Sequence, residues 1–237
     1  MNIDLTVLVP FYNEEEFLND SVKNLIDADF EKEIILIDDC STDNSSKIAK
    51  LFVDNYKNVS YLRTNKNLGK GNALSFSKKY INTSHVIIHD ADLEYSPDDI
   101  VEIYRFAKEY PNSLILGSRF KGSKVRNNLY LRTYIGNQVI SIFFSVVNMY
   151  RITDVATCYK MFPSKFFKNV NFIEQGFSIE VELLSKFLKY NKSVFEVPIE
   201  YNGRSYFQGK KIKTIDGYYY LFNIIKYKLS KLSYEFT

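Results

Sequence analysis

The chain has 237 residues, of which 46% are hydrophobic, and this length and composition predict one large domain around a single core. The 31 basic and 28 acidic residues leave a formal net charge of only +3, which gives no indication of a nucleic-acid partner. Cys40 and Cys158 lie far apart, which excludes a disulfide framework, and the N-terminus lacks the pattern of a secretory signal. We therefore expect a cytoplasmic protein.

The first 120 residues alternate short apolar runs with longer helical patterns. The apolar runs, each closed by polar residues, predict buried strands of a parallel sheet at 5–9, 34–37, 59–62, 86–88 and 114–116. Helical patterns lie near 14–28, 44–55, 70–82 and 97–109. This alternation predicts an α/β fold, a Rossmann-like sandwich with helices on both faces of a mostly parallel central sheet. Ligands of such sheets bind at the carboxyl ends of the strands.

After the fifth predicted strand the pattern changes, but no linker or repeat marks a second domain. The uncharged stretch 133–150 has the length of a membrane span. Its polar residues recur along one helical face, which instead predicts an amphipathic helix docked on the core or lying at an interface. Beyond it we expect a strand at 158–162, a helix near 178–189 and a strand at 193–197.

The C-terminal segment 214–237 is predicted to form an amphipathic helix. Between residues 201 and 237, seven basic residues stand against two acidic ones. Lysines beside an apolar, tyrosine-rich helix fit an anionic membrane surface, so we expect a peripheral protein on the inner face of a membrane. A terminal helix packed on the core explains the same pattern almost as well.

Carboxylates that follow the fourth predicted strand give the first chemical signal. Asp90, Asp92 and Glu94 stand within five residues. They could cap the next helix, but Ser96 as N-cap and Pro97 in the first turn already supply its start signals. Clustered carboxylates repel one another, and a divalent cation that also binds substrate phosphates relieves this repulsion. The pattern therefore predicts a Mg²⁺ or Mn²⁺ site that holds a diphosphate.

Polar residues also follow the first two predicted strands. Glu14 could equally be a favourable acid at a helix N-terminus, and Asp43 could equally be a helix cap. Asp39 is the second of two acids directly behind an apolar run, and we expect it to need a partner such as a base or a ribose hydroxyl. The segment 69–71 (GKG) lacks the spacing of a Walker A loop and could be a tight turn into a helix.

Five short segments form a pattern through their order and spacing. They are Leu8–Glu14 (LVPFYNE), Leu36–Asp43 (LIDDCSTD), Asn67–Ala73 (NLGKGNA), Asp90–Glu94 (DADLE) and Gly117–Arg119 (GSR). Together they resemble the family 2 glycosyltransferases with a GT-A-type fold, and most closely the dolichol-phosphate mannose synthase-like branch. The resemblance implies an inverting, metal-dependent enzyme that loads a sugar from a nucleotide-diphospho-sugar onto a polyprenyl phosphate. The resemblance covers nearly the whole chain. It divides the single predicted domain into a donor half (1–120) and an acceptor half with a basic loop (121–213).

The resemblance also implies roles for the residues at matching positions. Those implied to bind the donor are Pro10, Tyr12, Glu14, Ile37, Asp39, Asp90, Ala91, Asp92, Arg204 and Lys210. Asp92 and Glu94 are the implied metal ligands, and Arg119 is implied to lie beside the phosphates. The phosphate of the acceptor would meet Arg132, Arg204 and Lys211. Without the resemblance, Arg119 fits a surface ion pair, and the basic residues after 203 fit a solvated loop.

The nature of the acceptor decides whether the reaction needs a base. A polyprenyl phosphate is already an anion at pH 7 and can attack the anomeric carbon without a strong base. The hydroxyl of a glycan acceptor would need a carboxylate base, for which Asp154 and the weaker candidate Glu180 are present. Together with Asp90, Asp92 and Arg119, which the resemblance implies, Asp154 completes the catalytic candidates. A non-catalytic nucleotide-sugar-binding module would keep the binding residues without turnover, and a homo-oligomer is compatible with the sequence.

Overall fold

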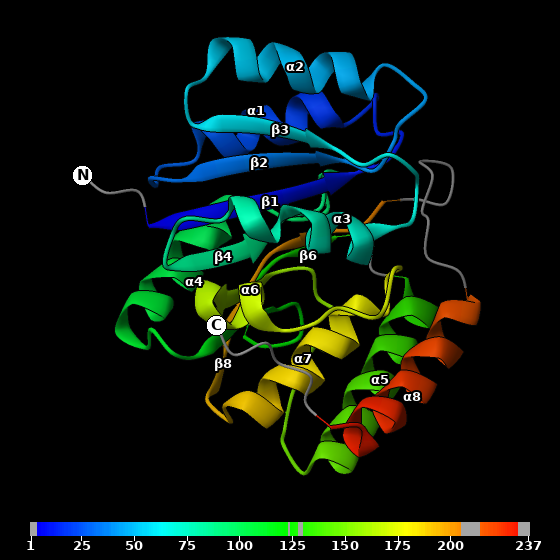
Figure 1. The fold of residues 1–237 in the computed structure, drawn as a ribbon. Coiled ribbons are helices and arrows are strands. Elements are labelled where there is room, and N and C mark those ends of the chain that lie inside the picture. Colours follow the sequence, from blue (N-terminus) through cyan, green and yellow to red (C-terminus); the bar gives the residue numbers. More distant parts are fainter. Residues whose placement is uncertain (1–3, 123, 128–129, 205–213, 232–237) are drawn as a thin grey trace.

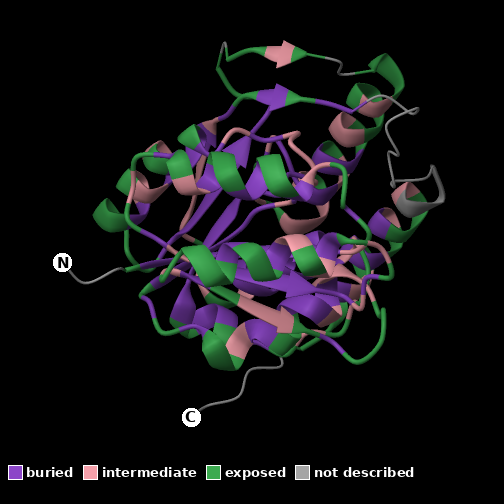
Figure 2. Ribbon diagram, turned by 90° about the horizontal axis from the view of Figure 1, so that it is seen from above, coloured by how far each residue is buried: buried purple, intermediate pink, exposed green. Residues whose placement is uncertain are grey.

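The computed structural model describes residues 4–122, 124–127, 130–204 and 214–231. Its centre is a seven-stranded sheet in the order β3-β2-β1-β4-β7-β5-β8, against which the helices pack (Figure 1). Every residue of β1, β4, β5 and β7 is buried, although successive side chains point to opposite faces of a sheet. Both faces are therefore covered, as predicted, and the buried strands run through the middle of the molecule (Figure 2).

All predicted strands and helices of the donor half are present, with ends shifted by a few residues. The strands are β1 (Leu5–Phe11), β2 (Glu33–Asp38), β3 (Val59–Arg63), β4 (His85–Ile88) and β5 (Leu114–Ser118). The helices are α1 (Leu18–Asp27), α2 (Ser45–Asn55), α3 (Lys70–Ser77) with the short 3₁₀ helix η1 (Lys78–Tyr80), and α4 (Asp98–Glu109).

The predicted start of α4 is wrong in one respect. Pro97 precedes the helix, and no side chain of the described residues caps this end. The carbonyl of Ser96 instead accepts hydrogen bonds from the Asp99 N–H at 3.2 Å and from the Tyr159 hydroxyl at 3.0 Å. Ser96 therefore contributes through its backbone, because its carbonyl serves both the first turn of α4 and a buried tyrosine.

The acceptor half completes the same sheet and does not form a separate unit. Its elements are β6 (Arg126–Asn127), α5 (Leu131–Asn148), β7 (Lys160–Pro163), α6 (Ser164–Asn169), α7 (Ile179–Tyr190), β8 (Val194–Pro198) and β9 (Tyr201–Asn202), followed by the C-terminal helix α8 (Thr214–Leu229). β7 lies between β4 and β5 and is antiparallel to both. β6 and β9 pair in a small parallel ribbon. The predicted helix residues 232–237 lie outside the described residues.

Helix α5 packs Ile140 and Phe144 against the protein together with Ser141, and it leaves other apolar side chains exposed. Ser141 is buried, and its hydroxyl accepts a hydrogen bond from the Val155 N–H at 3.1 Å. Ile142 and Val146, by contrast, are 62% and 71% exposed. Helix α8 packs beside α5 and also exposes large apolar side chains, at Tyr218, Phe222 and Leu229 among others (Figure 1). The buried residues fit the predicted docking of α5 on the core, and its exposed apolar residues leave the predicted interface as a second possibility. No helix within the described ranges is long and apolar enough to cross a bilayer.

Candidate active site

A cavity of about 420 Å³ opens where β1, β2, β4 and β5 end, and it extends to the inner sides of α5 and α8. Both halves of the chain line it. The predicted site residues around it are Pro10, Tyr12, Glu14, Asp39, Asp90, Ala91, Asp92, Glu94, Arg119, Arg132 and Arg204. Ile37 lies instead within the buried core of β2, and Asp154 lies behind Arg119. Lys210 and Lys211 fall outside the described residues.

The three acids that follow β4 have different partners. Asp90 Oδ1 lies 2.7 Å from Lys70 Nζ, whereas Asp92 Oδ2 lies 3.2 Å from Arg204 Nη2. Glu94 Oε1 accepts a hydrogen bond from the Arg204 N–H at 2.9 Å. Asp92 Oδ1 accepts from the Glu94 N–H at 3.2 Å, so the loop also folds back on itself. Neither aspartate belongs to the first turn of α4, and the cap explanation for them is excluded.

The surroundings of the two aspartates move their pKa values in opposite directions. Burial, followed by the negative charges of Glu94 and Asp90, raises the pKa of Asp92 to about 7, although Arg204 acts against this shift. Burial also opposes ionisation of Asp90, but the charge and hydrogen bond of Lys70, with the contributions of Cys158 and His89, together lower the pKa of Asp90. Asp92 thus lies where extra positive charge is most favourable.

Asp92 and Glu94 fit a hard divalent cation. Mg²⁺ and similar ions prefer oxygen ligands, and they commonly take one or two carboxylates and complete their shell with water and substrate phosphates. Within the described ranges, no three acidic, histidine or cysteine side chains are arranged to hold a metal ion by themselves. Asp92 and Glu94 could supply two of the oxygen ligands of such an ion, and a diphosphate could supply others.

Arg204 follows β9 and contacts acids that follow two different strands, β1 and β4. Its guanidinium contacts Glu14 at 3.3 Å and Asp92 at 3.2 Å, and it lies over the Phe17 ring at 5.0 Å. Glu14 also stands at the start of α1, because its carbonyl accepts hydrogen bonds from the Phe17 and Leu18 N–H groups at 3.0 and 2.8 Å, so both interpretations of this acid stay predictions. Glu14 faces the cavity with a cation beside it.

Arg119 and Asp154 form a buried ion pair. Arg119 Nε and Nη2 lie 2.7 and 2.8 Å from the two Asp154 oxygens, and the Arg119 N–H donates to the same carboxylate at 3.0 Å. The pair is buried, which rules out the surface ion pair considered for Arg119. Asp154 is fully buried behind the guanidinium, so it is placed to orient Arg119 and not to take a proton from a ligand in the cavity.

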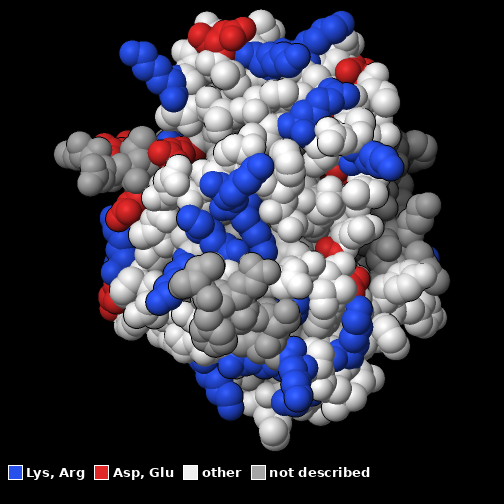
Figure 3. Space-filling model, in the orientation of Figure 1, with Lys and Arg blue, Asp and Glu red and all other residues white. Residues whose placement is uncertain are grey.

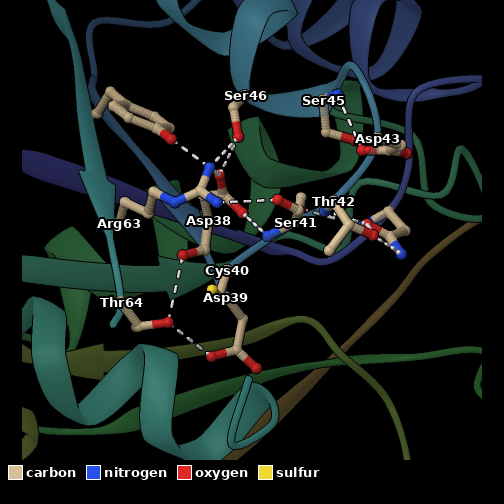
Figure 4. Close-up of polar contacts among 12 residues, drawn as sticks. Asp38, Asp39, Cys40, Ser41, Thr42, Asp43, Ser45, Ser46, Arg63 and Thr64 are labelled. Carbon is tan, nitrogen blue, oxygen red and sulfur yellow. Dashed lines mark hydrogen bonds and ion pairs between the residues drawn. The ribbon is translucent and has the colours of Figure 1, made fainter. Parts of the chain in front are cut away.

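Asp39 finds its partners within the chain. Its carboxylate accepts hydrogen bonds from the Thr64 hydroxyl at 3.0 Å and from the N–H groups of Leu68 and Gly69 at 3.2 and 2.6 Å. Figure 4 shows Asp39 and Thr64 pointing toward one another. The carboxylate thereby fixes the loop that leads into α3, and it still lines the cavity.

Asp38 at the end of β2 and Asp43 shortly after it stabilise the connection between β2 and α2. Asp38 is fully buried and accepts hydrogen bonds from the Ser46 hydroxyl at 2.5 Å and from the Ser41 N–H at 2.6 Å, and it pairs with Arg63 at 3.0 Å (Figure 4). Asp43 accepts from the Ser45 N–H at 2.9 Å. These contacts give Asp38 and Asp43 a structural role beside the cavity.

Sequence reasoning missed Lys70, which lies between two carboxylates at the base of the cavity. Its ammonium is 2.7 Å from Asp90 and 2.7 Å from Glu180. The flanking glycines were the available signal. Gly69 has a φ of 95°, and a Cβ added to Gly71 would lie 1.9 Å from the carbonyl oxygen of Glu174. The glycines therefore allow close contact between α3 and the segment 174–176, and this contact helps to place Lys70.

Comparisons with known proteins agree with this geometry. A family model described as glycosyl transferase family 2 matches residues 6–170. The chain is 26% identical to a UDP-N-acetylglucosamine–dolichyl-phosphate N-acetylglucosaminyltransferase of Methanococcus voltae, across 95% of this chain and 96% of that protein. It is 28% identical to a dolichol-phosphate mannosyltransferase of Pyrococcus furiosus, across 94% of this chain and 64% of that protein.

A solved structure supports the fold. Glucosyl-3-phosphoglycerate synthase from Mycobacterium tuberculosis, crystallised with Mn²⁺, uridine diphosphate and phosphoglyceric acid, superposes with a TM-score of 0.73 at 14% identity. The match covers 96% of this chain and 78% of that one. At this level of identity the likeness concerns the fold, and it confirms the predicted GT-A-type sandwich.

Proposed function

The chain belongs to glycosyl transferase family 2, and on that basis we propose that it moves a sugar from a nucleotide-diphospho-sugar onto a polyprenyl phosphate of the dolichol type. The observation that carries the proposal is a single cavity that joins the acids 90–94 at the strand ends to the inner sides of α5 and α8. Both relatives described above are named as transferases that act on dolichol or dolichyl phosphate, which supports this acceptor.

The donor occupies the part of the cavity formed by the strand ends. Asp92 and Glu94 hold Mg²⁺ or Mn²⁺, which when bound neutralises charge on the departing diphosphate. Arg119 and Arg204 supply further positive charge for the phosphates. The residues proposed to surround the nucleoside and sugar are Pro10, Tyr12, Glu14, Asp39, Asp90 and Ala91, all of which line the cavity.

The acceptor phosphate enters from the side of α5, where Arg132 lines the cavity. One of its oxygens forms a bond to the anomeric carbon while the bond from that carbon to the nucleoside diphosphate breaks, so the configuration at the carbon inverts. Neither candidate base for a hydroxyl acceptor is well placed, because Asp154 is paired with Arg119 and Glu180 with Lys70. This pairing favours an acceptor that is already anionic. Lys210 and Lys211 are retained as phosphate contacts of the basic loop.

The outer face of α5 and α8 is proposed to lie on a membrane surface. Its exposed side chains are apolar, including Ile142 and Val146 on α5 and Phe222 on α8. Lys226 and Lys228 lie in the last turn of α8, where Lys226 also pairs with Glu174 at 2.7 Å. On the whole face of the molecule drawn in Figure 3, Lys and Arg predominate over Asp and Glu. An apolar helix face bordered by lysines matches an anionic lipid surface. This arrangement would keep a lipid acceptor beside the cavity.

A panel of nucleotide sugars assayed with a short polyprenyl phosphate tests the proposal. Products are identified by mass, with Mg²⁺, with Mn²⁺ and with excess chelator. We expect a lipid-linked sugar only when a metal ion is present. Transfer to free saccharides alone would contradict the acceptor, full activity in chelator would contradict the metal, and nucleotide-sugar binding without any product would indicate a binding module.

A further inference from the structure

Two lysines and two carboxylates form a buried cluster at the base of the cavity. Lys70 begins α3, Asp90 follows β4, Lys160 lies in β7 and Glu180 lies in the first turn of α7. Lys70 contacts both Asp90 and Glu180 at 2.7 Å, and Lys160 contacts the other oxygen of Glu180 at 2.7 Å. Four elements from both halves of the chain thus meet in one set of ion pairs.

The charges of this cluster balance. Buried charges are tolerated in proteins when they are paired, and here two ammonium groups face two carboxylates. The side chains of Lys70, Lys160 and Glu180 are 9%, 0% and 4% exposed, whereas that of Asp90 is 26% exposed. Asp90 is therefore the member that reaches furthest into the cavity, and the protein itself supplies the cation that neutralises it.

The second aspartate of the same motif has a weaker arrangement of partners. Asp92 lies 3.2 Å from Arg204, a residue that also pairs with Glu14 and donates its N–H to Glu94. The guanidinium is thus shared between Asp92 and Glu14, whereas Asp90 has the ammonium of a buried cluster. The two aspartates differ in their need for an additional cation.

We propose that Lys70 is a positioning residue that neutralises and orients Asp90, and that this keeps Asp90 out of the metal coordination and leaves the metal to Asp92 and Glu94. Glu180 and Lys160 hold the ammonium of Lys70 in place. The inference rests on the proposed function, because it takes a metal at Asp92 as given. It assigns a role to Glu180 that differs from that of a catalytic base.

Direct measurement of Mn²⁺ binding tests the inference without relying on turnover. Mn²⁺ is titrated calorimetrically into the full chain in the presence of saturating UDP. In Lys70→Met the charge of Asp90 is no longer balanced, so Mn²⁺ should bind roughly three- to tenfold more tightly. Lys70→Arg keeps the charge and should retain the affinity of the wild type. Since a purely structural defect would weaken metal binding, tighter binding is a specific result.

Lys186→Met is the matched control. Lys186 is also buried and pairs with a carboxylate, Glu182, at 2.5 Å, but it lies outside the set of described residues that line the cavity. It should leave the affinity for Mn²⁺ unchanged, whatever it does to stability.

A double variant keeps the test decisive if Lys70→Met does not fold. Lys70→Met with Asp90→Asn removes both charges together and leaves Glu180 paired with Lys160. We expect it to bind Mn²⁺ within about twofold of the wild type, since no net charge is lost. A loss of about tenfold or more would show that Asp90 is a metal ligand and would overturn the inference, as would an unchanged affinity in folded Lys70→Met. Failure of the wild type to bind Mn²⁺ would instead contradict the metal proposal.

Discussion

The donor half and the acceptor half stabilise their buried acidic side chains in different ways, although both halves bury charged residues. In the donor half, Asp39 accepts hydrogen bonds from a hydroxyl group and from two backbone N–H groups. In the acceptor half, Glu180 and Glu182 on α7 instead pair with the buried lysines Lys160 and Lys186. Hydroxyl and backbone donors thus hold a buried acid of the donor half, whereas buried ammonium groups hold the acids of α7.

Helix α5, next to the cavity, places apolar side chains on more than one side. It buries Ile140 and Phe144 together with Ser141, and it exposes Ile142 and Val146. The contrast with the wholly buried strands teaches that the hydrophobic pattern of α5 alone does not identify the side that packs against the protein.

The largest expected effect comes from the donor half and tests whether its acids serve chemistry. Asp92→Asn should lower the transfer rate by about 10³- to 10⁴-fold, because one of two proposed metal ligands is lost. Initial rates with a nucleotide sugar measure this. Asp98→Asn, an exposed acid in the first turn of α4, is the control and should leave the rate unchanged. Equal rates for Asp92→Asn and the wild type would contradict a metal site at Asp92.

A buried ion pair between the two halves should matter more for stability than an exposed pair within the donor half. Asp154→Ala leaves the buried guanidinium of Arg119 without its partner and should lower the free energy of unfolding by about 3–5 kcal/mol. Glu102→Ala breaks an exposed pair with Arg105 on α4 and should cost less than about 1 kcal/mol. Urea unfolding measures both. Similar losses in the two variants would break the comparison.

The contact between the halves at Gly71 can be tested by adding a single methyl group. Gly71→Ala places a Cβ 1.9 Å from the Glu174 carbonyl oxygen, and the required shift should cost about 1–3 kcal/mol of unfolding free energy. Gly136→Ala on α5 meets no described atom within 4 Å and should be neutral or slightly stabilising. Thermal unfolding distinguishes them, and a neutral Gly71→Ala would show that the two segments separate without cost.

The smallest effect is expected at the outer face of α5. Val146→Ser should weaken binding to anionic vesicles by about tenfold and leave the unfolding free energy nearly unchanged, because an exposed methyl pair is removed from the proposed lipid contact. Leu51→Ser on α2 alters an exposed side chain of the donor half and should not change vesicle binding. Sedimentation with vesicles measures this, and equal effects of the two variants would argue against a membrane-facing α5.

The sequence predicted the donor half well because its strands are short, apolar and buried on both faces. The rule that ligands bind at strand ends predicts that Glu14, Asp39 and Asp92 lie near one another, and all three line the cavity. Local patterns also located α5 and α8, although the direction in which α5 faces depends on its neighbours.

Long-range pairings were beyond sequence reasoning. Lys70 and Glu180 are 110 residues apart, and nothing local indicates that they meet. The same holds for Arg119 and Asp154, which are 35 residues apart, so Asp154 could be predicted as an acid of the site but not as the partner of an arginine. The predicted cap at Ser96 was wrong, and here too a distant residue is involved. The Ser96 carbonyl accepts a hydrogen bond from the hydroxyl of Tyr159, which directly precedes β7.

The position of β7 has a consequence for how the chain can fold during synthesis. β4 and β5 are both made before residue 119, but the strand that separates them ends only at Pro163, and β8 follows later still. Until β7 has been made, β4 and β5 each have an unpaired edge with which another chain could pair. Pairing over such long sequence separations is slow, so the nascent protein should depend on rapid completion or on a chaperone to avoid aggregation. The donor half by itself therefore lacks the strand that lies between β4 and β5, however complete its binding residues are.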